Sequence, residues 1–316
     1  MQVSKPVFSS SAPGKIMLSG EYFVLWGATA FALPSRFRQY FEVFHLPKGH
    51  THHRWDTLLG DELIFSCEID KNTLECRNIK GSASSATYIT DLIKAAYSFN
   101  ASAFSQTCHF KTRLTFQPEW GLGSSSSLIV NVARYVEADA FALHRLVSQG
   151  SGYDVACALY EKPLLFKNPA KPEIYFSELN YDFTQHLFFL PLKIKQDSQA
   201  AVKDILSRQP PLDALKRASE ISVAMAHSEN LKEFETLLKE YMHLVKENLG
   251  LSNGLEEKFR DFRSTLKPLG AWGGDLALVV SQENEAYIRG YFAEKGFDTL
   301  LPWSEVIDLR KNSIQS

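Results

Sequence analysis

A glycine- and serine-rich stretch near the middle of the chain, residues 118–128, constrains the fold most strongly. It reads Pro-Glu-Trp-Gly-Leu-Gly-Ser-Ser-Ser-Ser-Leu, follows a strand-like run at 112–116 and precedes a helical run at 129–136. Glycines permit unusual backbone conformations and the close approach of a ligand. Serines at a helix start can cap it, beside free N–H groups that attract anions. Two interpretations follow: a phosphate-binding loop, or a well-capped strand–turn–helix connection.

The composition indicates a globular protein with one large or two ordinary domains. The chain has 316 residues, of which 45% are hydrophobic and 22% charged, and its net charge is −2. This balance gives no electrostatic reason to expect binding to nucleic acid or to an anionic membrane. The start of the chain lacks a signal-peptide pattern, and no apolar run is long enough to span a membrane. We therefore predict a cytoplasmic location.

Cysteine and histidine spacing points to neither a disulfide framework nor a metal centre. The four cysteines are Cys67, Cys76, Cys108 and Cys157. They form no close pair and are expected to be reduced and mostly buried. His50, His52 and His53 cluster in a polar stretch, where a metal site and a solvated loop are the alternatives. Because no second group of ligands follows at a suitable spacing, we expect a solvated loop.

Strands and helices mix along the chain without strict alternation, which favours an α+β fold. Runs of β-branched, aromatic and alternating apolar residues predict a hairpin region at 61–79 and strands at 8–18, 36–46, 107–116, 163–167, 173–177, 186–192, 276–281 and 299–301. Apolar residues at helical spacing predict helices at 84–99, 125–136, 139–148, 155–160, 198–206, 211–227, 230–248, 254–266 and 284–295. We predict a domain boundary near residue 180.

Three glycine-containing segments, far apart in the sequence, are candidates for one ligand site. They are residues 12–22, with Ala-Pro-Gly-Lys and Gly-Glu-Tyr, the loop at 118–128, and residues 270–275, with Gly-Ala-Trp-Gly-Gly-Asp. The chain lacks the Walker pattern, because Ile16 follows Lys15. It also lacks the dinucleotide-binding pattern, because Ser126 stands where a third glycine would be.

In this order the segments resemble the three signature motifs of the GHMP small-molecule kinases, named for galactokinase, homoserine kinase, mevalonate kinase and phosphomevalonate kinase. A Gly-Ser-Gly-Tyr-Asp run at 150–154 lies between the second and third motifs. The resemblance implies an α+β fold with an ATP-binding domain at 1–180, a ferredoxin-like domain at 181–316 and the active site in the cleft between them. It also implies ATP and Mg²⁺ as cofactors and ATP-dependent phosphorylation of an alcohol or phosphate acceptor.

The resemblance assigns roles to single residues. Asp154 matches the family's catalytic aspartate, which can take a proton from the acceptor oxygen. Lys15 matches the lysine near the transferred phosphoryl group, and Ser125 sits where the family places its magnesium-contacting hydroxyl. The residues expected to bind the nucleotide are Gly121, Leu122, Gly123, Ser124, Ser125, Ser126, Gly273 and Gly274. The candidates for substrate binding are Glu21, Lys193, Lys195 and Ser198.

Each of these side chains also has a structural interpretation. Asp154 can be the N-cap of the helix that follows it, and Lys15 can be a solvated lysine at a strand end. Glu21 either shapes the acceptor pocket or holds its own turn together. The lysines at 193 and 195 can bind an acceptor phosphate or carboxylate, or can simply be solvated.

One position departs from the mevalonate kinases, which place a glutamate about eleven residues before the catalytic aspartate as a second magnesium ligand. Leu143 occupies that position here, so metal binding would rest on Ser125 and the phosphates. This departure motivates an alternative function, a catalytically silent protein that senses a nucleotide or metabolite. Trp55 and Trp120 are candidates either for flanking the adenine or for packing in the interior.

Details of the motifs bear on the acceptor. Gly20-Glu21-Tyr22 replaces the Gly-Glu-His of mevalonate kinases, whereas the runs at 149–158 and 273–275 look more like phosphomevalonate kinases. The first run also resembles a bacterial GHMP group with the string Gly-Tyr-Asp-Ile-Ala. We predict phosphomevalonate or mevalonate as the acceptor, in isoprenoid precursor synthesis, with homoserine or sugar phosphorylation and diphosphomevalonate decarboxylation as alternatives. The expected partners are ATP and the acceptor, without nucleic acid or membrane, and a homodimer is compatible with the sequence.

Overall fold

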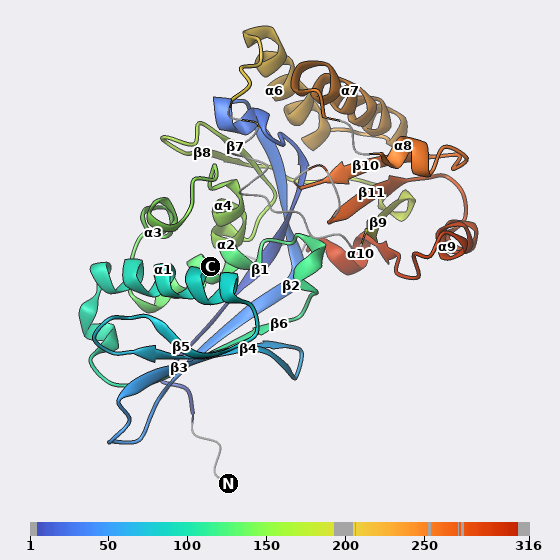
Figure 1. Cartoon of the computed structure of the whole chain (residues 1–316). Helices are drawn as coiled ribbons and strands as arrows, with labels where there is room; N and C mark the ends of the chain where they lie inside the picture. The colour runs from blue at the N-terminus through green and yellow to red at the C-terminus, as the bar shows by residue number, and fades with distance from the viewer. Residues whose placement is uncertain are drawn as a thin grey trace, which may run out of the picture. The chain divides into compact units, whose positions relative to one another are not determined.

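The computed structural model describes residues 5–192, 205, 207–251, 254–270, 272 and 275–308 (Figure 1). Its contacts divide the chain into two compact units that are interleaved along the sequence. Unit 1 comprises Met1–Gly14, Phe37–Gln117 and Gly123–Leu159, and unit 2 comprises Lys15–Arg36, Pro118–Leu122 and Tyr160–Ser316. Because both units are discontinuous, they do not test a single boundary, and the division at residue 180 stays a prediction.

Unit 1 contains a mixed sheet with the strand order β5-β4-β3-β6-β2. Strands β3 and β6 run parallel, and the other neighbours are antiparallel. The strands are β2 (Ala30–His45), β3 (His52–Leu59), β4 (Glu62–Asp70), β5 (Cys76–Lys80) and β6 (Cys108–Leu114), with β1 (Phe8–Ser19) paired to β2. The helices are α1 (Ala83–Phe99), the 3₁₀ turn η2 (Ala101–Phe104), α2 (Ser124–Tyr135), α3 (Ala140–Val147) and α4 (Tyr153–Tyr160).

The core of unit 1 lies between this sheet and the helices that cover it (Figure 1). The buried face of α1 carries apolar residues at helical spacing, which is the pattern that predicted the helix: Ala86, Ile89, Leu92, Ile93 and Ala96. Trp55 is fully buried, and its ring centroid lies 5.6 Å from that of Phe110. This burial leaves Trp55 no surface for an adenine ring, so its packing interpretation is the correct one.

Unit 2 contains two antiparallel strand arrangements and a set of helices. The first residues of β2 pair with β7, and β7 pairs with β8; a separate sheet has the order β10-β11-β9-β12. Its strands are β7 (Leu164–Lys167), β8 (Glu173–Phe176), β9 (Leu187–Pro191), β10 (Thr265–Leu269), β11 (Leu276–Val280) and β12 (Leu301–Pro302). Its helices and 3₁₀ turns are η1 (Phe23–Trp26), η3 (Pro118–Trp120), η4 (Thr184–His186), α6 (Leu212–Ala226), α7 (Leu231–Leu249), α8 (Leu255–Lys258), α9 (Glu285–Glu294) and α10 (Trp303–Val306).

The core of unit 2 forms around the four-stranded sheet. Phe188 of β9 and Val279 of β11 pack with Ile288 and Phe292 of α9 in one buried cluster. Helices α6 and α7 run side by side, and α7 also contacts β10 (Figure 1). The predicted α+β class is therefore confirmed.

Part of the histidine-rich stretch is a strand, so the predicted solvated loop is wrong for His52 and His53, whereas His50 is exposed and precedes the strand. His52 and His53 begin β3, and His53 is fully buried, with its Nδ1 accepting a hydrogen bond from the Cys108 N–H at 3.0 Å. Burial, with smaller contributions from Lys71 and His52, lowers the pKa of His53 to about 4. Pairing of β3 with β6, distant in sequence, outweighs the local polarity.

The helix predicted at 254–266 is also largely wrong. Only Leu255–Lys258 is helical, and strand β10 begins at Thr265. Pairing with β11 overrides the local helical pattern. Pro268 is tolerated because β10 is an edge strand of its sheet. The helix predicted at 198–206 lies almost entirely outside the described residues.

Candidate active site

The candidate residues fall into two groups, one in each compact unit, and each group is described within its own unit. Unit 2 holds Lys15, Glu21 and the first half of the glycine loop, and unit 1 holds the second half of the loop, at 123–126, with Asp154. The loop therefore supplies residues to both units through consecutive positions in the chain.

Lys15 is fixed against the first half of the glycine loop. Its backbone N–H donates to the Leu122 carbonyl at 2.8 Å, and its Nζ donates to the Gly121 carbonyl at 2.9 Å. Lys15 is only 8% exposed, so its interpretation as a solvated strand-end lysine is wrong. Strand β1 thus holds an ammonium group at the loop that the sequence assigned to phosphate binding.

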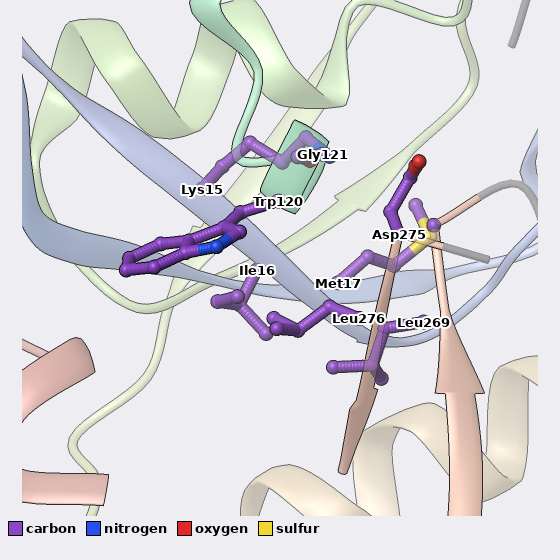
Figure 2. Close-up of a pocket in the computed structure, with 9 residues that line it drawn as sticks. Lys15, Ile16, Met17, Trp120, Gly121, Leu269, Asp275 and Leu276 are labelled. Carbon is purple, nitrogen blue, oxygen red and sulfur yellow. The ribbon is translucent and has the colours of Figure 1, made fainter. Parts of the chain in front are cut away.

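A small pocket in unit 2 gathers Lys15 with parts of the second and third glycine segments (Figure 2). Figure 2 shows the indole of Trp120 along one side of this pocket and Asp275 on the other. The lining residues are Lys15, Ile16, Met17, Trp120, Gly121, Leu269, Gly270, Asp275 and Leu276. Trp120 therefore lines the same pocket as the ammonium group of Lys15, and its role in contacting a ligand stays a prediction.

Asp275 is a pocket residue that the sequence analysis did not select. Its carboxylate lies against the backbone of Gly121: a Cβ built on Gly121 would be 2.5 Å from Asp275 Oδ2. Gly121 also has φ +65°, a left-handed conformation that glycine adopts without strain. Only glycine at this position lets the loop and the carboxylate approach so closely. Asp275 is the last residue of the third glycine segment, and that proximity to a motif was the available signal.

Glu21 forms a buried ion pair with Lys267, and both side chains are at most 1% exposed. The Lys267 Nζ also donates to the Pro268 carbonyl at 3.1 Å. Burial lowers the pKa of Lys267, and the charge of Glu21 opposes that shift. The hydroxyl of Tyr241 accepts from the Gly20 N–H at 2.8 Å and donates to the Glu21 carbonyl at 3.1 Å.

These contacts are those of a residue that holds its turn together, which was one of the two interpretations of Glu21. Within the described residues, Glu21 Oε2 and the indole N–H of Trp272 are buried without a hydrogen-bond partner. Glu21 is not among the residues that line the pocket, and its role toward an acceptor stays a prediction. Lys267 could not have been selected from the sequence, because it lies 246 positions from Glu21.

The second half of the glycine loop forms the start of α2. Gly123 is the N-cap residue, in a left-handed conformation and without a side-chain cap. The Ser126 hydroxyl donates back to the Gly123 carbonyl at 2.8 Å, and the Ser127 hydroxyl donates to Gln39 Oε1 at 2.7 Å. The interpretation as a serine-capped helix is therefore wrong. The first N–H groups of the helix lack intrahelical partners and can bind an anion.

Ser125 differs from its neighbours in this turn. It is exposed, and its hydroxyl makes no hydrogen bond to the described part of the chain. Its carbonyl accepts a hydrogen bond from the Tyr88 hydroxyl of α1 at 3.1 Å. Ser124 is half-buried and Ser126 is buried. Of the three serines expected to bind the nucleotide, Ser125 thus presents the most accessible hydroxyl.

Asp154 lies in the first turn of α4, one residue inside the helix rather than at the N-cap. Its Oδ1 accepts from the Val155 N–H at 3.0 Å. Burial and the negative charge of Asp154 raise the pKa of the Tyr88 hydroxyl. Burial lowers the pKa of His144, and the Asp154 charge opposes this. Tyr88 therefore lies near both Ser125 and Asp154. Tyr88 and His144 belong to no motif, so neither was selected from the sequence.

The remaining predicted positions are Leu143 and five residues that the structure does not describe. Leu143 is fully buried in the apolar core of unit 1. In the described ranges, no group of three or more His, Cys, Asp or Glu side chains is arranged to hold a metal ion. The predicted residues Gly273, Gly274, Lys193, Lys195 and Ser198 lie outside the described residues.

Similarity to solved structures covers nearly the whole chain. Streptococcus pneumoniae phosphomevalonate kinase, solved with phosphomevalonate and AMPPNP, has a TM-score of 0.69 and 17% identity, over 93% of this chain and 99% of that chain. Methanococcus jannaschii mevalonate kinase has a TM-score of 0.68 and 17% identity, over 93% and 96% of the two chains. A D-glycero-D-manno-heptose 1-phosphate kinase from Bacteroides thetaiotaomicron has a TM-score of 0.59 and 13% identity, over 93% and 94%.

Sequence comparison alone finds no relative: no protein-family model matches the chain, and no curated protein matches it. None of the helices in the described ranges has the length and apolar character needed to cross a membrane. The matched structures include a phosphomevalonate kinase and a mevalonate kinase, which belong to the family that the three motifs resemble. The chain therefore has the fold of the GHMP small-molecule kinases.

Proposed function

We propose that this protein transfers the γ-phosphoryl group of ATP to a small-molecule acceptor, and that the acceptor is phosphomevalonate or mevalonate. The observation that carries the proposal is the position of Lys15. A nearly buried ammonium group lies 2.9 Å from the carbonyl of Gly121, in a loop whose pattern matches a phosphate-binding motif. A buried cation beside a glycine loop favours an anionic ligand.

The second half of the loop supports the same ligand. The free N–H groups at the start of α2 and the positive end of its dipole stabilise negative charge. Phosphoryl transfer depends mainly on positioning and on the neutralisation of charge on the transferred group. Lys15 supplies a fixed positive charge, and the loop supplies backbone donors. Both are held by the fold before a ligand binds, so little reorganisation is needed.

Asp154 is the proposed general base. With an alcohol acceptor, its carboxylate takes the hydroxyl proton as the acceptor oxygen attacks the γ-phosphorus and the bond to the ADP oxygen breaks. With phosphomevalonate, the attacking oxygen belongs to a phosphate that is already largely ionised, so Asp154 mainly orients the acceptor. The Val155 N–H bond fixes one carboxylate oxygen and leaves the other available.

The residues present fit a magnesium ion that is held mainly by phosphates. The exposed Ser125 hydroxyl is an oxygen donor of the kind that Mg²⁺ prefers, and the ion ordinarily keeps several waters. When bound, the ion neutralises charge on the phosphate oxygens. The chain's own contribution is to hold Ser125 in place, through the hydrogen bond from Tyr88 to its carbonyl.

The choice of acceptor rests on the motifs. The runs at 149–158 and 273–275 look like those of phosphomevalonate kinases, and we place phosphomevalonate ahead of mevalonate. Lys193, Lys195 and Ser198 remain our candidates for binding its phosphate or carboxylate, and Glu21 for shaping its pocket. We also propose a cytoplasmic location for this reaction.

An ADP-release screen tests both the reaction and the acceptor. The panel contains phosphomevalonate, mevalonate, homoserine, galactose and a heptose 1-phosphate, each with ATP and magnesium. We expect turnover with phosphomevalonate or mevalonate, and its loss in Asp154→Asn and Lys15→Met proteins that remain folded by circular dichroism. Binding of AMPPNP without turnover of any acceptor would instead support the silent-sensor alternative. Release of carbon dioxide would support decarboxylation.

A further inference from the structure

Cys67 and Cys76 are neighbours in unit 1, although they are nine positions apart and lie on different strands. Their sulfur atoms are 2.8 Å apart, a proximity in the folded chain that their spacing in the sequence did not indicate. The sulfur–sulfur distance lies between the length of a disulfide bond, about 2.05 Å, and the separation at which non-bonded carbon atoms pack best, about 3.5–4.0 Å. Both residues are free thiols. A movement of about 0.8 Å would bring the sulfurs to bonding distance.

The backbone around the two thiols already holds this arrangement. Cys76 pairs with Ile69 across the antiparallel strands β4 and β5. The turn between the strands is fixed by Asp70, whose N–H donates to the Glu75 carbonyl at 3.0 Å and whose carboxylate accepts from the Thr73 N–H at 3.0 Å. Bond formation therefore requires rotation of side chains and no new path for the chain.

The two thiols differ in access and acidity. Cys67 is 2% exposed, whereas Cys76 is half-buried, so a small reagent in solution can reach the Cys76 thiol. The contact with Cys67 lowers the pKa of Cys76 to about 7, against the opposing effect of burial. A thiolate is the reactive form of cysteine in exchange reactions. Cys76 is therefore the attacking thiol and Cys67 the resolving one.

We propose that Cys67 and Cys76 form a redox-active dithiol that is oxidised to an intramolecular disulfide by small-molecule disulfides such as glutathione disulfide. The Cys76 thiolate attacks one sulfur of the oxidant, releases one glutathione thiolate and forms a mixed disulfide. Cys67 then loses its proton, attacks the Cys76 sulfur and releases the second glutathione. The protein loses two electrons and two protons, and the oxidant becomes two thiols.

The disulfide would act on the edge of the sheet. Strand β5 is the terminal strand of the order β5-β4-β3-β6-β2 in unit 1. The Cys76 N–H donates to the Thr90 hydroxyl of α1 at 3.2 Å, which places the dithiol beneath that helix. Oxidation would tie the edge strand to β4 at this point. We expect slower amide exchange across β5 in the oxidised protein, and this holds whether or not the chain is a kinase.

Mass spectrometry of the full chain tests the proposal. The reduced protein is incubated with glutathione disulfide, remaining thiols are alkylated, and the chain is digested without reduction. We expect the intact mass to fall by two hydrogen atoms, two fewer alkylated cysteines, and one peptide that links Cys67 to Cys76. The linked peptide should be absent after reduction. A wild-type protein that keeps all four thiols, retains glutathione on Cys76, or links other cysteines would overturn the proposal.

Two variants separate the roles of the thiols. Cys67→Ser should accumulate a persistent mixed disulfide on Cys76, because the resolving thiol is gone, and Cys76→Ser should acquire neither modification. Cys108→Ser, which alters another buried cysteine of unit 1, should form the Cys67–Cys76 link like the wild type. If Cys67→Ser does not fold, Cys67→Ala takes its place. Cys67→Ser should release one equivalent of glutathione and the wild type two, so release of a second equivalent by Cys67→Ser would contradict the resolving role of Cys67.

Discussion

Replacing Lys267 by methionine would leave the carboxylate of Glu21 buried without its cation. The two side chains are 0% and 1% exposed, and one Glu21 oxygen already has no hydrogen-bond partner among the described residues. Removing one partner of a buried ion pair typically costs about 3–5 kcal/mol, because the remaining charge is uncompensated. For a unit of 150–250 residues, each kcal/mol shifts the melting temperature by about 2–4 °C. We therefore expect a fall of about 6–20 °C.

Differential scanning fluorimetry with a double-mutant cycle measures this effect. Glu21→Gln combined with Lys267→Met removes both charges, and it should be markedly more stable than Lys267→Met alone. The matched control is Arg217→Met, which breaks the exposed Arg217–Glu240 pair in the same unit, where the side chains are 45% and 38% exposed. That substitution should cost less than about 1 kcal/mol. A Lys267→Met protein that loses no more stability than Arg217→Met, or a double variant as unstable as Lys267→Met, would show that the buried pair does not have this effect.

Three further predictions concern the loop, a helix beside it and a buried histidine. Gly121→Ala should weaken AMPPNP binding and lower the melting temperature, because the new Cβ would clash with Asp275. Gly254→Ala is the control for backbone strain, because Gly254 has φ +66° and open space around it. An equal fall in melting temperature for the two variants would exclude the clash. Tyr88→Phe should weaken AMPPNP binding by about 2- to 10-fold in calorimetry, which corresponds to the loss of one hydrogen bond. Tyr97 is exposed on the same helix, and Tyr97→Phe should leave the affinity unchanged. Equal affinities for the wild type and both variants would contradict the role of Tyr88. His53 has its pKa lowered from 6.5 to about 4 in the folded state, so the unfolded chain binds a proton that the native protein does not. Stability should therefore fall as the pH drops from about 6.5 to 4, by at most about 3 kcal/mol. His53→Gln should reduce this dependence in urea unfolding, and an unchanged slope would show that His53 is not responsible.

Much of the fold was predictable because its signals are local. Apolar residues recur at helical spacing over α1, so the helix predicted at 84–99 matches Ala83–Phe99. The helix predicted at 139–148 corresponds to α3, which Asp139 caps, with its carboxylate accepting from the Ala142 N–H at 2.7 Å. Strand β3 was missed because its local pattern is polar; it is held by β4, which follows across a short turn, and by β6, about fifty positions later in the chain. Pattern reading detects what neighbours in sequence determine and misses what distant pairing determines.

The candidate site was predictable to a similar extent. The glycine and serine motifs identified Lys15 and Gly121, and the structure places them in contact. No local pattern connects Glu21 with Lys267, or Tyr88 with Ser125, because each pair is joined only by the folded chain. Capping of α2 by the serines was one of two interpretations, and their hydroxyls bond elsewhere or face solvent. That Gly123 itself is the N-cap, in a left-handed conformation, is a property of the backbone that the serine pattern did not indicate.

The central claim is phosphoryl transfer that depends on Lys15 and Asp154. Phosphorus NMR of the full chain with ATP, magnesium and phosphomevalonate or mevalonate follows the reaction directly. The account predicts loss of the γ-phosphate signal and growth of an acceptor-bound phosphoryl signal, a diphosphate in the case of phosphomevalonate, with neither change in folded Asp154→Asn or Lys15→Met proteins. It is contradicted if ATP remains intact with both acceptors, or if the two variants react at the rate of the wild type.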